Sequence, residues 1–221
     1  MAFRAEVRRA LAAPLGGPLG RRLGAAAGTV IVGDARGEAR DEVALAELIE
    51  ALARAGVPRG RQLVLLAGGE GAPAAVTARR LRLVLGVPVV AHDPAGAHFV
   101  AGRDAGGAPI ELDDELREAE EVAIAGRFAA DAGGRVSGGP AALWPGLAPA
   151  AAAATLAREL EALPATERAA ATLARAAPAL AAATVGFALL WSAHDPPRVR
   201  AGEAASVFAA CVREGWLAAR S

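Results

Sequence analysis

Three glycine-rich loops are the parts of the sequence best suited to chemistry. They span residues 33–40, 68–73 and 126–146. Glycine permits positive φ angles and close approach of the backbone, so such loops can surround an anion such as phosphate. Tight connections between secondary-structure elements also use glycine. For any one loop, the sequence leaves both interpretations open.

Carboxylates and one hydroxyl lie within these loops. Asp34, Glu70 and Asp131 can act as general acids or bases, or hold a divalent cation. Solvent exposure is the favoured alternative for Glu70 and Asp131, because most carboxylates are exposed. Ser137 has no Gly-x-Ser-x-Gly turn, so we expect its hydroxyl to serve an anion site rather than a nucleophilic reaction. The candidate ligand-binding residues are Asp34, Gly68, Gly69, Glu70, Asp131, Ser137, Gly138 and Gly139.

The histidines and the cysteine favour packing over catalysis. His92 precedes Asp93, but adjacent residues of an extended segment point to opposite faces, which favours structural hydrogen bonding. His98 and His194 have no second ligand at metal-binding spacing. Cys211 is the single cysteine, which excludes an internal disulfide and fits a reducing compartment. We predict no metal site.

The charged residues also exclude several classes of function. All 24 basic residues are arginine, so the chain has no lysine for a Schiff base or a Walker-type phosphate loop. The 24 acidic residues balance them, and a net charge of zero favours neither nucleic acid nor an anionic membrane as partner. We expect the cluster Arg79, Arg80 and Arg82 to form a solvated helix face.

Two apolar segments could serve as a targeting signal or a membrane span. Residues 1–13 carry several charges and predict an amphipathic helix rather than a signal peptide. Residues 176–193 are charge-free, but they contain Pro178 and many small residues, and their later part favours a buried strand. We therefore expect a cytoplasmic protein without a membrane span.

Strands and helices alternate along the chain. Strands are expected at residues 29–32, 62–67, 87–91, 121–125 and 184–191 and near 198, with further short ones at 98–101 and 109–112. Helices are expected at residues 43–55, 76–85, 114–119, 155–163, 166–177 and 203–219. This alternation predicts a Rossmann-like α/β fold, a mostly parallel sheet with helices on both faces. Ligands bind beyond the carboxyl ends of such strands, where the glycine-rich loops lie.

Several short phrases occur in a characteristic order. An Ala-Leu-x-x-Pro phrase at residues 10–14 precedes the strand that ends at Asp34, and His92 begins a His-Asp phrase. Residues 67–73 align with an Ala-Thr-Gly-Thr-His-Arg-Pro loop and residues 107–110 with Gly-Thr-Pro-Val. In these phrases, and over nearly its whole length, the chain resembles the N-terminal domain of the nickel-pincer-dependent lactate racemases. Of that family's Asp-x-Thr-Arg-Pro motif, only Asp34 is kept.

The most specific motif of that family aligns with residues 126–146 without a gap. Gly126, the Ser137-Gly138-Gly139 triplet and a final Pro-Gly are kept. The resemblance places altered residues at four functional positions. A loop histidine falls on Gly71, a second histidine on Asp131, the cofactor-bearing lysine on Ala141 and a metal-binding histidine on Ala157.

These four changes remove the family's chemistry in this register. In the family, the lysine holds a nickel pincer nucleotide and the histidines bind nickel or exchange the hydroxyl proton of the substrate. A methyl group at Ala141 cannot form the covalent link, and Asp131 is a poor base at neutral pH unless burial raises its pKa. We expect no nickel pincer cofactor, and a single domain over residues 1–221 without the family's C-terminal domain.

Two functions from different classes remain. The first is a pseudoenzyme that binds a small anionic ligand or interacts with a protein partner or a second copy of itself. The alternative is a divergent racemase or epimerase acting on a hydroxy acid or a related small anion, through Asp34, Glu70 or Asp131.

Overall fold

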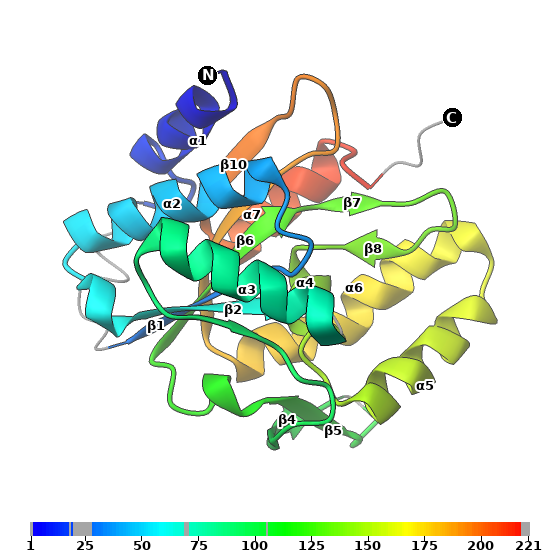
Figure 1. The fold of residues 1–221 in the computed structure, drawn as a ribbon. Coiled ribbons are helices and arrows are strands. Elements are labelled where there is room, and N and C mark those ends of the chain that lie inside the picture. Colours follow the sequence, from blue (N-terminus) through cyan, green and yellow to red (C-terminus); the bar gives the residue numbers. More distant parts are fainter. Residues whose placement is uncertain (1, 18, 20–27, 69–70, 105, 218–221) are drawn as a thin grey trace.

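The computed structural model describes residues 2–17, 19, 28–68, 71–104 and 106–217 (Figure 1). The candidate residues Gly69 and Glu70 lie outside the described residues. For Gly71, only its place in the backbone is described.

A six-stranded sheet forms the centre of the molecule, in the order β10-β9-β6-β1-β2-β3. The parallel strands are β1 (Thr29–Asp34), β2 (Gln62–Ala67), β3 (Val89–Ala91), β6 (Glu121–Arg127) and β9 (Val185–Trp191). At one edge, β10 (Val199–Glu203) pairs antiparallel with β9. The predicted mostly parallel sheet is confirmed, and β1 lies between β2 and β6.

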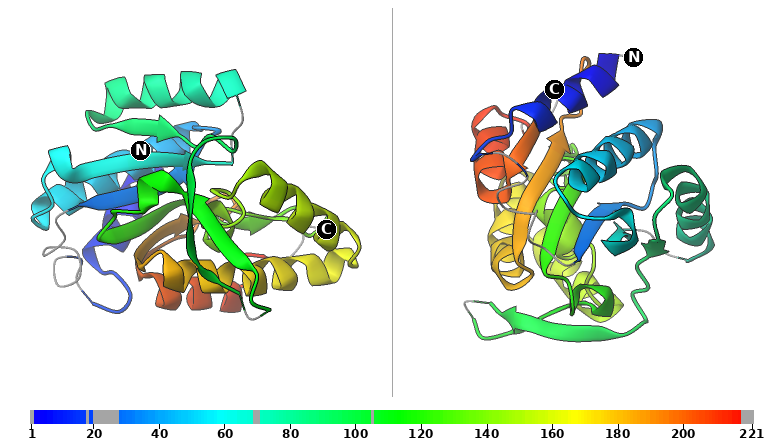
Figure 2. Two further views of the ribbon diagram at one scale, coloured as in Figure 1. Left: turned by 90° about the horizontal axis from the view of Figure 1, so that it is seen from below. Right: turned by 90° about the vertical axis from the view of Figure 1, so that its left-hand side faces the viewer.

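Helices cover both faces of the sheet, as predicted (Figure 2). One face carries α1 (Ala2–Ala12), α2 (Ala39–Arg54) and α3 (Gly71–Leu85). The other carries α4 (Pro140–Leu143), α6 (Ala165–Ala182) and α7 (Ala204–Arg213), with α5 (Ala150–Glu161) packed beside α6. On β1, Ile31 enters the first core, whereas Val30 and Val32 enter the second. This alternation explains why the strand is apolar throughout.

Two small antiparallel hairpins lie outside the main sheet. The first joins β4 (His98–Arg103) to β5 (Pro109–Asp113), where the sequence predicts two short strands. The second joins β7 (Ala129–Ala130) to β8 (Val136–Ser137) within the longest glycine-rich loop. That loop is therefore largely structured, because it also contains α4.

Several predicted helix boundaries are wrong: α2 begins at Ala39, α5 begins at Ala150 and α6 ends at Ala182, four or five residues beyond the predicted limits. α3 begins at Gly71 rather than at residue 76, since Ala74 already packs into the core. The helix predicted at residues 114–119 is one 3-10 turn, η3 (Asp114–Leu116), although Asp113 caps it as expected by accepting from the backbone N–H of Glu115 at 3.0 Å. α7 ends at Arg213, because Gly215 adopts a positive φ of 73°.

The charge-free segment 176–193 divides between the end of α6 and strand β9. α6 continues through Pro178 to Ala182, and the fully buried Ala176 and Ala179 hold its last turns against the neighbouring elements. The expected buried strand in this segment is confirmed as β9. None of the described helices has the length and hydropathy that a membrane span requires.

Candidate ligand pocket at the carboxyl edge of the sheet

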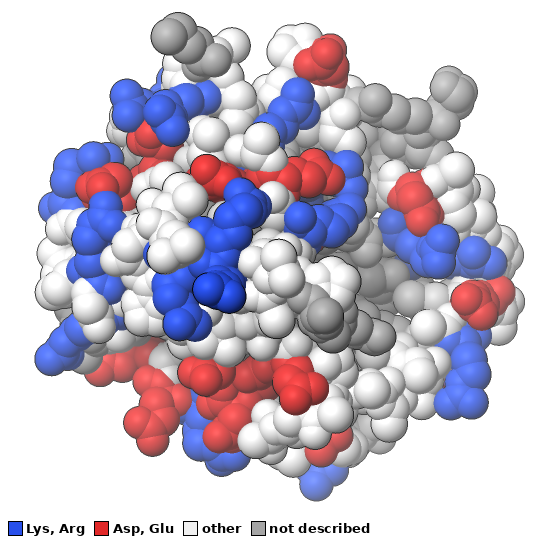
Figure 3. Space-filling view, in the orientation of Figure 1, with Lys and Arg blue, Asp and Glu red and all other residues white. Residues whose placement is uncertain are grey.

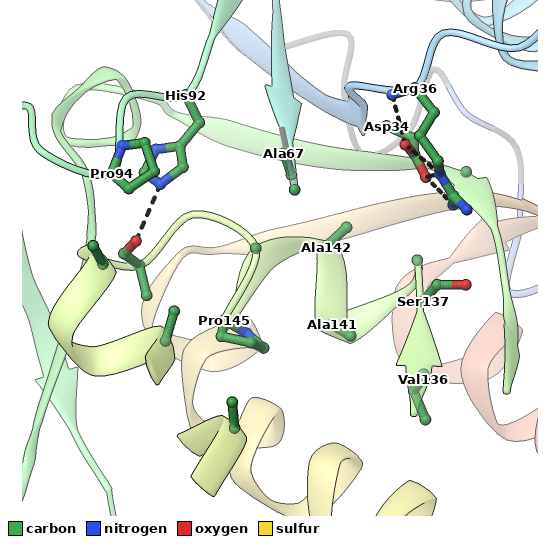
Figure 4. A pocket seen from close by; sticks show the side chains of 18 of the residues that line it. Asp34, Arg36, Ala67, His92, Pro94, Val136, Ser137, Ala141, Ala142 and Pro145 are labelled. Carbon is green, nitrogen blue, oxygen red and sulfur yellow. Dashed lines mark hydrogen bonds and ion pairs between the residues drawn. The ribbon is translucent and has the colours of Figure 1, made fainter. Parts of the chain in front are cut away.

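A pocket of about 820 Å³ opens where strands β1, β2 and β6 end. Asp34 ends β1, Gly68 follows β2, and Gly126 lies near the end of β6. β1 is the strand from which the chain builds the sheet in both directions, so the pocket lies at the topological switch point, where α/β folds bind ligands. α4 and α5 form the opposite wall. Figure 4 shows this space from close by.

Asp34 and Arg36 form the charged end of the pocket. The Asp34 carboxylate accepts hydrogen bonds from the backbone N–H and the Nε of Arg36, both at 2.9 Å, and from its Nη2 (Figure 4). The Arg36 side chain remains 45% exposed, compared with 17% for Asp34. The carboxylate thus holds the guanidinium at the rim while leaving donors free for a ligand.

His92 lies at the other end of the pocket and is almost completely buried. Its Nδ1 lies 2.6 Å from Oδ2 of Asp113, and its Nε2 lies 3.1 Å from the carbonyl oxygen of Ala148. Both partners are hydrogen-bond acceptors, so each nitrogen of the ring faces an acceptor. His92 therefore ties the end of β3 to the end of β5 and to the loop after α4. These contacts agree with the predicted structural hydrogen bonding, and the adjacent Asp93 is not a partner of the ring.

Ser137 ends β8 and lines the same pocket as Arg36 (Figure 4). Its hydroxyl is 3.5 Å from the carbonyl oxygen of Ala129, at the outer limit of a hydrogen bond. The hydroxyl lines the pocket and is weakly held, so it is available to a ligand.

The glycines around the pocket fall into two groups. At Gly68 and Gly126, a Cβ atom would meet nothing within 4 Å, so these two residues border open space. At Gly138, with a φ of 72°, a Cβ would overlap the carbonyl of Arg127, and at Gly139, with a φ of 53°, it would lie 2.7 Å from the ring of Phe128. Gly138 lines the pocket, but its neighbours leave no room for a side chain, so packing alone explains the glycine. Gly139 is not among the described residues that line the pocket.

Methyl groups form the wall opposite the charged residues. Ala141 and Ala142 come from α4, and Ala150, Ala153, Ala154 and Ala157 from α5. Spacings of three and four residues place the α5 alanines on one face of that helix. Ala141 and Ala157, two of the four altered functional positions, therefore line the same pocket.

Asp131, a third altered position, is not among the described residues that line the pocket. Asp131 lies at the turn between β7 and β8, where its carboxylate accepts from the backbone N–H of Arg135 at 2.9 Å and from the Nε of the same residue at 3.1 Å. The backbone bond is the main reason that the pKa of Asp131 lies below its usual value. Gly71 begins α3. Among the described residues, no three histidine, cysteine or acidic side chains are grouped so as to hold a metal ion.

Asp41 is a buried carboxyl group close to the charged end of the pocket. It belongs to the first turn of α2, and its Oδ2 accepts from the backbone N–H of Glu38 at 2.7 Å. Burial, followed by the negative charge of Asp34, raises the pKa of Asp41 to about 7. In the sequence, Asp41 resembles an ordinary helix-capping carboxylate, and no local pattern distinguishes it.

The residues in the pocket do not fit a covalently held nickel pincer nucleotide. The position that corresponds to the attachment lysine carries the methyl group of Ala141, and the position of a nickel ligand carries that of Ala157. A methyl group neither forms the covalent bond nor donates an electron pair to a metal. We derive no reaction step through this cofactor.

Comparison with known proteins gives a structural likeness only. No family profile and no curated protein sequence matches the chain. The lactate racemase apoprotein from Thermoanaerobacterium thermosaccharolyticum is similar in structure, with a TM-score of 0.77 and 18% identity over 96% of this chain and 54% of the racemase. A protein from Thermotoga maritima aligns with a TM-score of 0.60 and 14% identity over 97% of this chain and 58% of its own. The chain thus spans about half the length of each, and it has the fold of that part of lactate racemase.

Proposed function

We propose that this chain is a binding domain with the lactate racemase fold, which holds a small anion in its pocket and does not carry out nickel-pincer racemisation. One observation carries the proposal. A pocket at the switch point of the sheet keeps polar groups on its strand side but has methyl groups at Ala141 and Ala157.

The charged end of the pocket suits a carboxylate or a phosphate. A guanidinium presents several donors in one plane and binds such groups through paired hydrogen bonds. Arg36 is oriented by Asp34, and the Ser137 hydroxyl lies nearby as a further donor. A volume of about 820 Å³ is within the range of small-molecule sites. The alanine wall accommodates an apolar part of the ligand.

The same pocket offers little for moving a proton. Both nitrogens of His92 already contact acceptors, so this ring supports the fold rather than exchanging protons with a ligand. Among the described residues that line the pocket, Asp34 is the one acidic side chain, and Glu70 lies outside the described residues. For the alternative, a divergent racemase or epimerase, D34N should abolish any turnover of a hydroxy acid that is detected.

Calorimetric titration with inorganic phosphate and with lactate tests the binding proposal. We expect R36A to weaken binding of the anion about tenfold or more, because a charged hydrogen bond contributes about 1.5–3 kcal/mol. S137A should weaken it less. R213A removes an exposed arginine from α7, outside the pocket, and serves as the matched control. Equal affinities for R36A, R213A and the wild type, or no binding of either anion, would contradict the proposal.

A further inference from the structure

The outer face of α3 exposes large apolar side chains among arginines. Arg79 and Arg80 lie three and four residues after Val76, and Leu83 lies four and three residues after them, so the four residues form one stripe on the helix. The Leu83 side chain is 81% exposed and that of Val76 is 68% exposed. Val84, beside the stripe, is 55% exposed. This stripe is more apolar than the solvated helix face that the sequence predicts.

The charges on the stripe are only partly neutralised. Arg80 contacts Glu42 and the carbonyl oxygen of Gly37. Arg79 is exposed, and its side chain has no hydrogen-bond or ion-pair partner within the described part of the chain. The stripe therefore carries a positive charge that is available to a partner.

An acidic segment lies next to α3 on the same side of the molecule. Figure 3 shows acidic side chains gathered below the arginines of α3, over the region that follows β5. This segment contains Asp114, Glu115, Glu118 and Glu120, and its one arginine, Arg117, pairs with Asp114. Glu115 and Glu118 are both exposed. One face of the molecule thus presents a basic apolar stripe and an acidic segment side by side.

We propose that this face is the interface of a symmetric dimer of the chain. A two-fold rotation places the α3 stripe of one copy against the acidic segment of the other, and the reverse contact forms at the same time. Leu83 and Val76 then lose their contact with water, which favours association. The proposal is independent of the pocket and of its ligand.

The arrangement of charges favours a second copy over another partner. An acidic partner that covered α3 would bring like charges against the adjacent acidic segment, whereas a copy turned by 180° meets opposite charges on both patches. The contact must include both patches. A helix of 15 residues is roughly 22 Å long, and one of its faces alone is smaller than the approximately 800 Å² per partner of a stable interface.

Sedimentation at several protein concentrations tests the dimer. We expect the wild type to reach twice its monomer mass of 22.1 kDa at low ionic strength, and to dissociate as salt screens the exposed charges. L83E should be monomeric. V212E is the matched control, since Val212 is an exposed valine on α7, which covers the opposite face of the sheet, and this variant should dimerise like the wild type.

Exchange of charges identifies the partner as a second copy. R79E and E118R should each weaken the dimer, and the double variant R79E/E118R should associate more strongly than either single variant, because opposite charges then face each other again. The four substituted residues are all exposed, namely Arg79, Leu83, Glu118 and Val212. Circular dichroism should therefore show that the variants fold normally. A monomer at every concentration, a dimer that L83E leaves intact, or a double variant weaker than both single ones would overturn the proposal.

Discussion

The two walls of the pocket face the same space but differ in chemistry. The strand side contributes Asp34, Arg36 and the open glycines Gly68 and Gly126, whereas α4 and α5 contribute methyl groups. In the racemase-like register, the missing lysine and nickel ligand both fall on the helical side, at Ala141 and Ala157. The two walls therefore divide the chemistry of the pocket, because its charged groups lie on the strand side and its methyl groups on the helical side.

Substitution of two glycines that line the pocket should give the largest difference in stability. G138A should lower the free energy of unfolding by about 4 kcal/mol, because the new Cβ is strained at positive φ and overlaps the carbonyl of Arg127. G126A should change it by no more than about 0.5 kcal/mol, because its Cβ would enter open space. Urea denaturation measures both. Similar losses of stability in the two variants would show that Gly138 is no more constrained by its neighbours than Gly126.

Replacement of His92 should have the second largest effect on the free energy of unfolding. H92A leaves the carboxylate of Asp113 and the carbonyl oxygen of Ala148 buried without their donor, so the free energy of unfolding should fall by about 3 kcal/mol. H98A is the control, because His98 is only partly buried and makes one local hydrogen bond, to the carbonyl oxygen of Gly96. If H92A were as stable as the wild type, the contacts of His92 with Asp113 and Ala148 would not stabilise the fold.

Sequence patterns predicted the strands that border the pocket better than the side-chain contacts between distant residues. Strands β1, β2 and β6 are apolar runs bounded by glycine, and their parallel arrangement alone places Asp34, Gly68 and Gly126 at one edge. The pairing of His92 with Asp113 joins residues that are 21 positions apart, so no local pattern reveals it. Arg36 was overlooked, although an arginine two residues after Asp34 was a visible signal.

Glycine conformations also depend on distant neighbours. Gly138 and Gly139 look like ligand-binding glycines in the sequence, yet the main chain of Arg127 and the ring of Phe128 explain them. Asp131 was placed in the cleft by alignment, but the β7–β8 hairpin directs it to Arg135. In each case the deciding contact forms only when the chain folds.

Asp41 makes the stability of the charged end depend on pH. Its pKa is about 7 in the folded chain against an ordinary value of 3.8, so between these values the folded state binds more protons than the unfolded state. The group therefore stabilises the fold at low pH, and this stabilisation is lost as the pH rises through 7. Between pH 6 and pH 8 the loss is about 1.4 kcal/mol.

D41N removes this dependence, because an asparagine oxygen can still accept from the backbone N–H of Glu38. Thermal unfolding of the wild type and of D41N at pH 6 and pH 8 should show that the variant loses less stability over this interval. Parallel pH profiles would mean that Asp41 does not titrate in this range.

The last prediction concerns the reactivity of Cys211, which lies outside both walls of the pocket. Burial is the main reason that the pKa of its thiol is raised to about 12. At pH 8 the native protein should therefore react with an alkylating reagent much more slowly than the protein unfolded in urea. Equal rates would indicate that α7 opens readily.

We propose that the pocket does not support nickel-pincer racemisation, because the methyl groups of Ala141 and Ala157 line it. The most direct measurement is to incubate the wild type with the nickel pincer nucleotide and one lactate enantiomer, and to record protein mass and enantiomer ratio together. We predict an unchanged mass of 22.1 kDa and an unchanged enantiomer ratio. A covalent adduct accompanied by racemisation would contradict the account.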